Sequence, residues 1–184
     1  MWNTFFKIMD LSVREITVKD IDLLLEYWFT SSDDHFLKMG ADASKLPKRE
    51  EFYNILVDQI NSPIENKKSY ALIWEENGKQ IGHTNVNNIE FGKEAFMHLH
   101  VWNTANRKKG SGAILVKKSL PFYFQKLELQ TLYCQPYALN PAPNKTLQKV
   151  GFEFVKKYRT IPGSLNFEQE VNLWKMTRHQ FLEL

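Results

Sequence analysis

The chain has 184 residues, of which 43% are hydrophobic and 24% are charged, and its formal net charge is +3. A chain of this length and composition buries its own core as one domain, which excludes disorder and collagen-like repeats. The one cysteine, Cys134, excludes an intramolecular disulfide and a cysteine-based zinc cluster, and it fits a reducing compartment. With no apolar run longer than five residues and no signal-peptide pattern at residues 1–10, we expect a cytoplasmic protein outside the membrane.

The first half of the chain predicts one strand and two helices. We assign residues 1–11 to an N-terminal extension and residues 12–184 to a single domain, whose first strand covers residues 13–17. Thr17 and Asp20 then have the spacing of a capping box. Apolar residues recur at helical spacing on both sides of a polar stretch at residues 31–48. The two stripes are Ile21, Leu24, Leu25 and Trp28, and then Phe52, Ile55, Leu56 and Ile60.

The second half alternates strands with two helices. A period of two residues, interrupted by turn signals, predicts an antiparallel meander over residues 70–74, 79–89 and 95–102. A helix follows from about Gly112 and is bent by Pro121, and a short helix opens at Asn140-Pro141 and closes at Gly151. The remaining strands are predicted at residues 129–137, 152–160 and 167–176. The order β-α-α-β-β-β-α-β-α-β-β indicates a mixed α/β (α+β) fold with helices on the faces of a sheet.

A basic glycine loop between the third meander strand and the next helix is the most informative motif. It reads Arg107-Lys108-Lys109-Gly110-Ser111-Gly112, and residues 107–118 contain five basic residues and no acidic one. The first turn of a helix leaves backbone N–H groups unpaired and favours negative charge, while glycine lets a phosphate approach the main chain closely. The loop therefore predicts a pyrophosphate site, the alternative being an ordinary glycine loop with solvated lysines. It matches neither the dinucleotide G-x-G-x-x-G nor a Walker A loop.

Two motifs together resemble a known family. Arg107-x-x-Gly110-x-Gly112 resembles the Q/R-x-x-G-x-G/A signature of the GNAT superfamily of acyl-CoA-dependent N-acetyltransferases. Asn140-x-Ala142 and Lys149-Val150-Gly151-Phe152 resemble its ribosomal-protein-alanine-acetyltransferase-like branch, and the resemblance covers residues 12–177. It implies a mostly antiparallel mixed sheet of about seven strands, with helices on both faces and one splayed parallel pair.

The resemblance also implies where a co-substrate binds. Acetyl-CoA would lie, without any metal, between the strand ending at Trp102 and the strand ending at Tyr137. Arg107 and the amides of Lys108, Lys109, Gly110, Ser111 and Gly112 would hold its pyrophosphate. Main-chain groups of His100, Val101 and Trp102 would pair with the pantetheine arm, and one amide would polarise the thioester carbonyl. Asn140 would lie near the cofactor sulfur, and Lys145 would reach the adenosine phosphates unless it is simply solvated.

The chain departs from the family pattern at its acid and base positions. Phe96 stands where many members have a glutamate base, and Leu147 and Pro143 replace the tyrosine and serine that can protonate the thiolate. His98 and His100 share a strand face and are candidate bases, and Tyr137 is a candidate acid. Each has an alternative reading as a buried structural or packing residue. The histidines lack a carboxylate at metal-ligand spacing.

The expected activity is transfer of an acetyl group to a primary amine, either a protein N-terminus or a small molecule, by direct attack. The resemblance places this acceptor between the first two helices and the loop joining the last two strands. There Asp33 and Asp34, near Tyr27 and Trp28, would suit a cationic amine, unless they only solvate a loop. The alternatives are a non-catalytic acyl-CoA sensor and a nucleic-acid-binding domain. Basic residues such as those of the glycine loop would suit a nucleic acid, but binding of the CoA phosphates explains them equally. We expect a monomer or homodimer without nucleic-acid or membrane partners.

Overall fold

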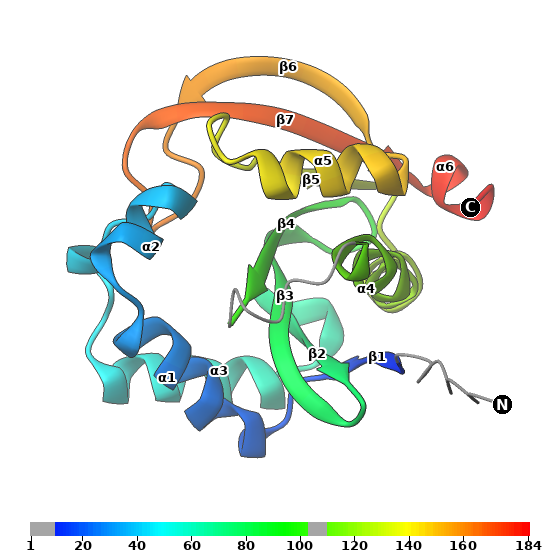
Figure 1. The fold of residues 1–184 in the computed structure, drawn as a ribbon. Coiled ribbons are helices and arrows are strands. Elements are labelled where there is room, and N and C mark those ends of the chain that lie inside the picture. Colours follow the sequence, from blue (N-terminus) through cyan, green and yellow to red (C-terminus); the bar gives the residue numbers. More distant parts are fainter. Residues whose placement is uncertain (1–9, 103–109) are drawn as a thin grey trace, which may run out of the picture.

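The computed structural model describes residues 10–102 and 110–184 (Figure 1). Arg107, Lys108, Lys109 and most of the expected N-terminal extension lie outside the described residues. The strands are β1 Leu11–Glu15, β2 Ser69–Glu76, β3 Lys79–Glu90, β4 Glu94–Val101, β5 Thr131–Cys134, β6 Glu153–Thr160 and β7 Gln169–Thr177. The α-helices are α1 Ile21–Thr30, α2 Asp33–Met39, α3 Arg49–Asn61, α4 Ser111–Pro121, α5 Pro141–Val150 and α6 Arg178–Leu182. None of the described helices is long and apolar enough to cross a bilayer.

The described strands form one seven-stranded sheet in the order β1-β2-β3-β4-β5-β7-β6. Every neighbouring pair is antiparallel except β4 and β5, which are parallel. This confirms the predicted mixed fold with a mostly antiparallel sheet and one parallel pair. The hairpin of β6 and β7 arches over the far edge of the sheet, beside α5 (Figure 1).

The parallel pair opens after only four residue pairs. β4 and β5 pair from Glu94 opposite Thr131 to Met97 opposite Cys134, and β4 then continues to Val101 paired with β3 only. Strand β5 is therefore shorter than the predicted 129–137. Beyond Cys134 the chain leaves β4 but stays beside β7, its neighbour on the other edge. Tyr137 forms a bridge with Val171, and the amide of Ala138 donates to the carbonyl of Glu170.

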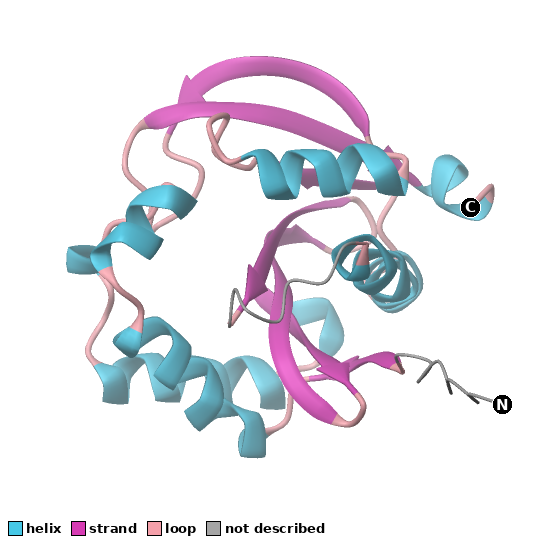
Figure 2. Ribbon diagram, viewed as in Figure 1, coloured by secondary structure: helices cyan, strands magenta, loops and turns pink. Residues whose placement is uncertain are grey.

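Helices cover both faces of the sheet and bury two separate apolar clusters (Figure 2). The larger cluster lies under α4 and α5 and contains the fully buried rings of Trp74, Tyr123 and Phe124. The smaller cluster joins α1 and α2 to the end of the meander, with Trp28 and the partly buried Trp102 among its members. The predicted first helix is confirmed, since Ile21, Leu24, Leu25 and Trp28 are all buried.

Three local features refine the predicted elements. The capping box of Thr17 and Asp20 is present and starts a 3-10 turn, Val18–Asp20, that leads into α1. The stretch predicted as polar contains α2, which Ser32 caps by accepting a hydrogen bond from the amide of His35. Pro121 ends α4, and the chain continues as a π-helical turn, Phe122–Lys126.

Candidate active site

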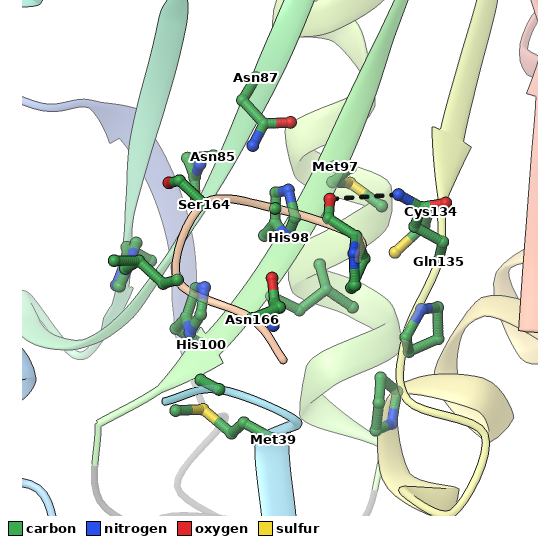
Figure 3. Close-up of a pocket in the computed structure, with 18 of the residues that line it drawn as sticks. Met39, Asn85, Asn87, Met97, His98, His100, Cys134, Gln135, Ser164 and Asn166 are labelled. Atoms are coloured by element: carbon green, nitrogen blue, oxygen red, sulfur yellow. Dashed lines mark hydrogen bonds between the residues drawn. The ribbon is translucent and has the colours of Figure 1, made fainter. Parts of the chain in front are cut away.

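The opening of the parallel pair borders a cavity of about 310 Å³, which we call the central cavity (Figure 3). Its walls come from β3, β4 and the segment after β5, from α1 and α3, and from the loop that joins β6 to β7. Gly163 of that loop lies over the sheet, because a Cβ placed on it would be 4.0 Å from both Asn87 Nδ2 and His98 Cε1. The loop therefore closes one end of the central cavity.

The free edge of β4 presents main-chain amides to the gap. The Trp102 amide donates to the Ile81 carbonyl on the β3 side, at 3.0 Å. In a regular antiparallel ladder consecutive residues direct their N–H groups to opposite edges, so Leu99 and Val101 face the side that β5 has left. Of the three residues predicted to pair with a cofactor through the main chain, the register selects Val101. The amides of His100 and Trp102 face β3.

His83 is held in one neutral tautomer. Its Nδ1 accepts a hydrogen bond of 2.7 Å from the indole N–H of Trp102, which can only donate. Nδ1 therefore has no proton, and the ring is neutral with its hydrogen on Nε2. Burial, with the neighbouring His98 as the smaller cause, lowers the pKa of His83 to about 3. Sequence reasoning missed this residue, because no motif marks it and only the β3–β4 register brings it to the site.

His100 stacks on His83 and connects the sheet to α1. The two imidazole centroids are 4.5 Å apart with an interplanar angle of 13°. Nδ1 of His100 lies 3.2 Å from the hydroxyl oxygen of Tyr27, which also lies 3.0 Å from Nε2 of His35. Burial, followed by the proximity of His83, holds the pKa of His100 well below its usual range. His100 is thus part of a packed ring cluster and is neutral at physiological pH.

His98 differs from His100 because its Nε2 is buried with no hydrogen-bond partner among the described residues. Burial lowers the pKa of its imidazole to about 4. Two side-chain oxygens on the central cavity are also buried and unpaired within the described chain, Oδ1 of Asn87 and Oε1 of Gln169, and both are acceptors. Asn85, Asn87 and His98 lie together in Figure 3, close to Ser164. Unpaired buried acceptors in a cavity indicate a site for a ligand with hydrogen-bond donors.

The two polar candidates beyond β5 have different environments. Asn140 precedes α5 without capping it through its side chain, and both Asn140 and Tyr137 line the central cavity. Asn144 fixes this segment, since its Nδ2 donates to the carbonyls of Tyr137 and Asn140. Its Oδ1 accepts from Asn172 and from the indole of Trp174, at 2.9 Å each. Asn144 therefore positions Asn140 and Tyr137 at the gap.

The described part of the glycine loop forms the start of α4. Gly110 occupies the N-cap with φ of +95°, a conformation that other residues rarely adopt, and Ser111 and Gly112 begin the helix. The ammonium of Lys149 on α5 lies 3.5 Å from the position that a Cβ of Gly110 would take. Lys149 thus adds positive charge beside the first turn of α4. The lysine expected from the sequence was Lys145, one turn earlier and also exposed, and Lys149 was not expected.

The predicted acid and base positions of the family pattern are structural here. Phe96 stacks on Tyr133 with ring centroids 5.2 Å apart, and Leu147 is fully buried in the larger cluster. Asp33 and Asp34 lie in the first turn of α2 and do not line the central cavity; Asp34 pairs with Lys38. Over residues 10–102 and 110–184, no three His, Cys, Asp or Glu side chains are grouped as metal ligands.

The fold and this geometry define an acyltransferase. The family model of the acetyltransferase (GNAT) domain matches residues 10–153, and the chain belongs to that family. No curated protein matches the chain. The enzyme class and the sequence-based recognition of the superfamily are thereby confirmed.

Solved structures share the fold at low sequence identity. A spermidine N-acetyltransferase from Vibrio cholerae, in complex with CoA and spermine, has a TM-score of 0.75 at 15% identity, over 94% of this chain and 98% of that one. A ribosomal L7/L12 alpha-N-protein acetyltransferase, in complex with coenzyme A, has a TM-score of 0.71 at 14% identity, over 92% of this chain and 95% of that one. An uncharacterised protein from Bacillus halodurans has a TM-score of 0.68 at 17% identity, over 95% of this chain and 88% of that one. At these identities the likeness concerns the fold.

Proposed function

We propose that this protein is an acetyl-CoA-dependent N-acetyltransferase that moves an acetyl group to a primary amine by direct attack. The observation on which this depends is the opened β4–β5 pair, whose unpaired β4 amides border the central cavity. The structural neighbours from Vibrio cholerae and the ribosomal enzyme are named for amine acceptors, spermidine and a protein N-terminus. These names support an amine as the acceptor. The single sheet supports one catalytic domain over residues 12–184 after an extension of residues 1–11.

In this proposal the cofactor lies across the gap from α4 to β4. The amides at Gly110, Ser111 and Gly112 bind the pyrophosphate, because they lie at the positive end of the α4 helix dipole, where anions are stabilised. Lys149 adds a charge on the α5 side, and Arg107, Lys108 and Lys109 stay predicted contributors. Whether Lys145 reaches the adenosine phosphates also stays a prediction.

The pantetheine arm would pair with the free edge of β4. Leu99 and Val101 direct their amides into the gap, so one of them can pair with pantetheine while the other donates to the thioester carbonyl. A donor aimed at that oxygen stabilises the negative charge that develops as the amine attacks. Asn140, placed by Asn144, would lie at the sulfur end of the arm.

The reaction needs an unprotonated amine. Its nitrogen forms a bond to the carbonyl carbon, the carbon–sulfur bond breaks, and the proton released by the amine must leave while the thiolate gains one. His98 is the better candidate base, since its buried Nε2 is unpaired and its imidazole is neutral above about pH 4. His100 has its Nδ1 engaged at Tyr27 and fits a positioning role better. Tyr137 stays the candidate acid.

Release of free CoA, followed with a thiol reagent across an amine panel, tests the proposal together with one pair of variants. Gly112→Glu puts a carboxylate among the α4 amides, where glutamate stabilises the helix end but repels a pyrophosphate. We expect at least about tenfold weaker CoA binding without loss of folding stability, since one repelled charge at close range is worth ~1–2 kcal/mol. Ile114→Glu, at an exposed position two residues further along α4, is the matched control. Equal CoA affinity in both variants would contradict this binding site, and CoA binding without turnover of any amine would favour the sensor alternative.

A further inference from the structure

The central cavity has no charged wall. Within the described chain its lining residues include no Asp, Glu, Lys or Arg. Its three histidines, His83, His98 and His100, are uncharged at neutral pH because burial lowers the pKa of each. Asp42, which follows the lining residue Ala41, is not part of the lining and accepts hydrogen bonds from Ser44. A bound cation would find no counter-charge along these walls.

The cavity also has two chemically distinct ends. Apolar side chains from α1, α3 and the end of α2 line one end, and polar side chains of β3 and of the β6–β7 loop line the other. Figure 3 shows Met39 of α2 and Asn87 of β3 on opposite sides of His98. The apolar end consists of Leu24, Trp28, Met39, Phe52 and Leu56. At the polar end Asn87 Oδ1 and His98 Nε2 are buried without partners, as is Gln169 Oε1 at the base of β7. An occupant that completes this site has an apolar part and donates hydrogen bonds without bearing a permanent charge.

We propose that the acceptor is a compact monoamine whose body is uncharged, with an apolar part and a hydroxyl or amide donor, and that polyamines are excluded. This inference rests on the proposed acetyltransferase function and concerns the same site. The reacting amine loses its proton before attack, so it needs no counter-charge. A second ammonium must either be buried charged and unpaired or give up a second proton, and both are unfavourable. A hydroxyl or amide N–H, by contrast, can donate to Asn87 or Gln169.

A rate comparison on the full chain tests the inference. We would measure kcat/KM for CoA release with tyramine, 1,4-diaminobutane, spermidine and a short peptide with a free N-terminus. We expect tyramine to exceed both polyamines by about 10²-fold or more, since an unpaired buried charge costs ~3 kcal/mol or more. Polyamine rates equal to or above the tyramine rate would overturn the inference while leaving the acetyltransferase function intact. A peptide preferred over tyramine would also overturn it, because its body is neither compact nor uncharged.

A single isosteric variant then tests whether the uncharged lining is the cause of the preference for tyramine over polyamines. Asn87→Asp places one carboxylate at the polar end and should shift the ratio of diamine to tyramine rates by at least about tenfold toward the diamine. Asn88→Asp makes the same change at the adjacent exposed residue and should leave the ratio unchanged. CoA affinity and the thermal midpoint report whether either variant is folded. An unchanged ratio in folded Asn87→Asp overturns the inference. If that variant does not fold, the wild-type rates with tyramine and the polyamines still decide whether the inference holds. Absence of CoA release with every acceptor would instead overturn the proposed function, and the inference with it.

Discussion

Acidification should destabilise this protein well before its carboxylates titrate. The cause is the histidine group of β3 and β4, in which burial lowers the pKa of His83 to about 3 and that of His98 to about 4. An unfolded histidine titrates near 6.5. Below pH 6.5 the histidines therefore bind protons in the unfolded chain but not in the folded chain. The free energy of unfolding falls as the pH falls.

The size of the effect follows from the pKa difference. Each such histidine reduces the unfolding free energy by about 1.4 kcal/mol per pH unit between pH 6.5 and its folded pKa. Between pH 7.5 and pH 5 this gives about 2 kcal/mol for each of His83 and His98, or about 4 kcal/mol together. His100 acts in the same direction, since its pKa is also lowered. A loss of this size is a large part of the 5–15 kcal/mol that stabilises a typical domain.

Urea unfolding at pH 7.5 and pH 5 measures the loss, and His98→Asn identifies its source. The variant removes one titrating group, so its difference between the two pH values should be about 2 kcal/mol smaller than that of the wild type. His179→Gln is the control, because the side chain of His179 is 83% exposed. Equal unfolding free energies of the wild type at the two pH values would refute the reasoning. An imidazole NMR titration showing His83 protonated near pH 6.5 would refute it as well.

Two further predictions concern the cofactor side. Cys134→Ala should leave turnover nearly unchanged, because burial raises the pKa of this thiol to about 12 and makes it a poor nucleophile; a loss of several hundredfold would indicate an acetyl-enzyme intermediate. Lys149→Gln should weaken CoA binding about three- to fivefold at low salt, as expected for one exposed ion pair, and the effect should shrink at high salt. Lys118→Gln, near the other end of α4, should change nothing, and equal effects of the two lysine variants in a calorimetric titration would rule out a specific role for Lys149.

Local chemistry made much of the fold predictable from the sequence. The Thr17–Asp20 capping box, the Asn140-Pro141 start of α5 and the Gly151 end of that helix are all present, the last with φ of +107°. The β2–β3–β4 meander was visible because turn residues with positive φ at Asn77, Gly78 and Gly92 separate its strands, although β2 is buried on both faces. Signals of this kind depend on neighbours within a few residues, which is the range over which a sequence pattern can be read.

The site was less predictable because it depends on long-range pairing. The end of β5 is the point where the chain separates from β4 while it stays beside β7, and no local pattern reports that point. His83 and Trp102 are nineteen residues apart in the chain and meet only through strand register. Helix α2 was missed since its seven residues are mostly polar and exposed, so they show no apolar stripe.

The same desolvation that keeps the histidines neutral explains why a carboxylate base can be absent at Phe96. A low-polarity, uncharged cavity disfavours the protonated form of any basic group inside it, and it lowers the pKa of a bound ammonium just as it lowers that of His98. An acceptor amine that enters this cavity loses its proton more easily than it does in water. A neutral imidazole with a free buried nitrogen then suffices to take the proton, whereas a buried glutamate would hold the ammonium as an ion pair. The charge-free lining and the replaced glutamate are therefore two parts of one arrangement, which favours amines that have a single charge to lose.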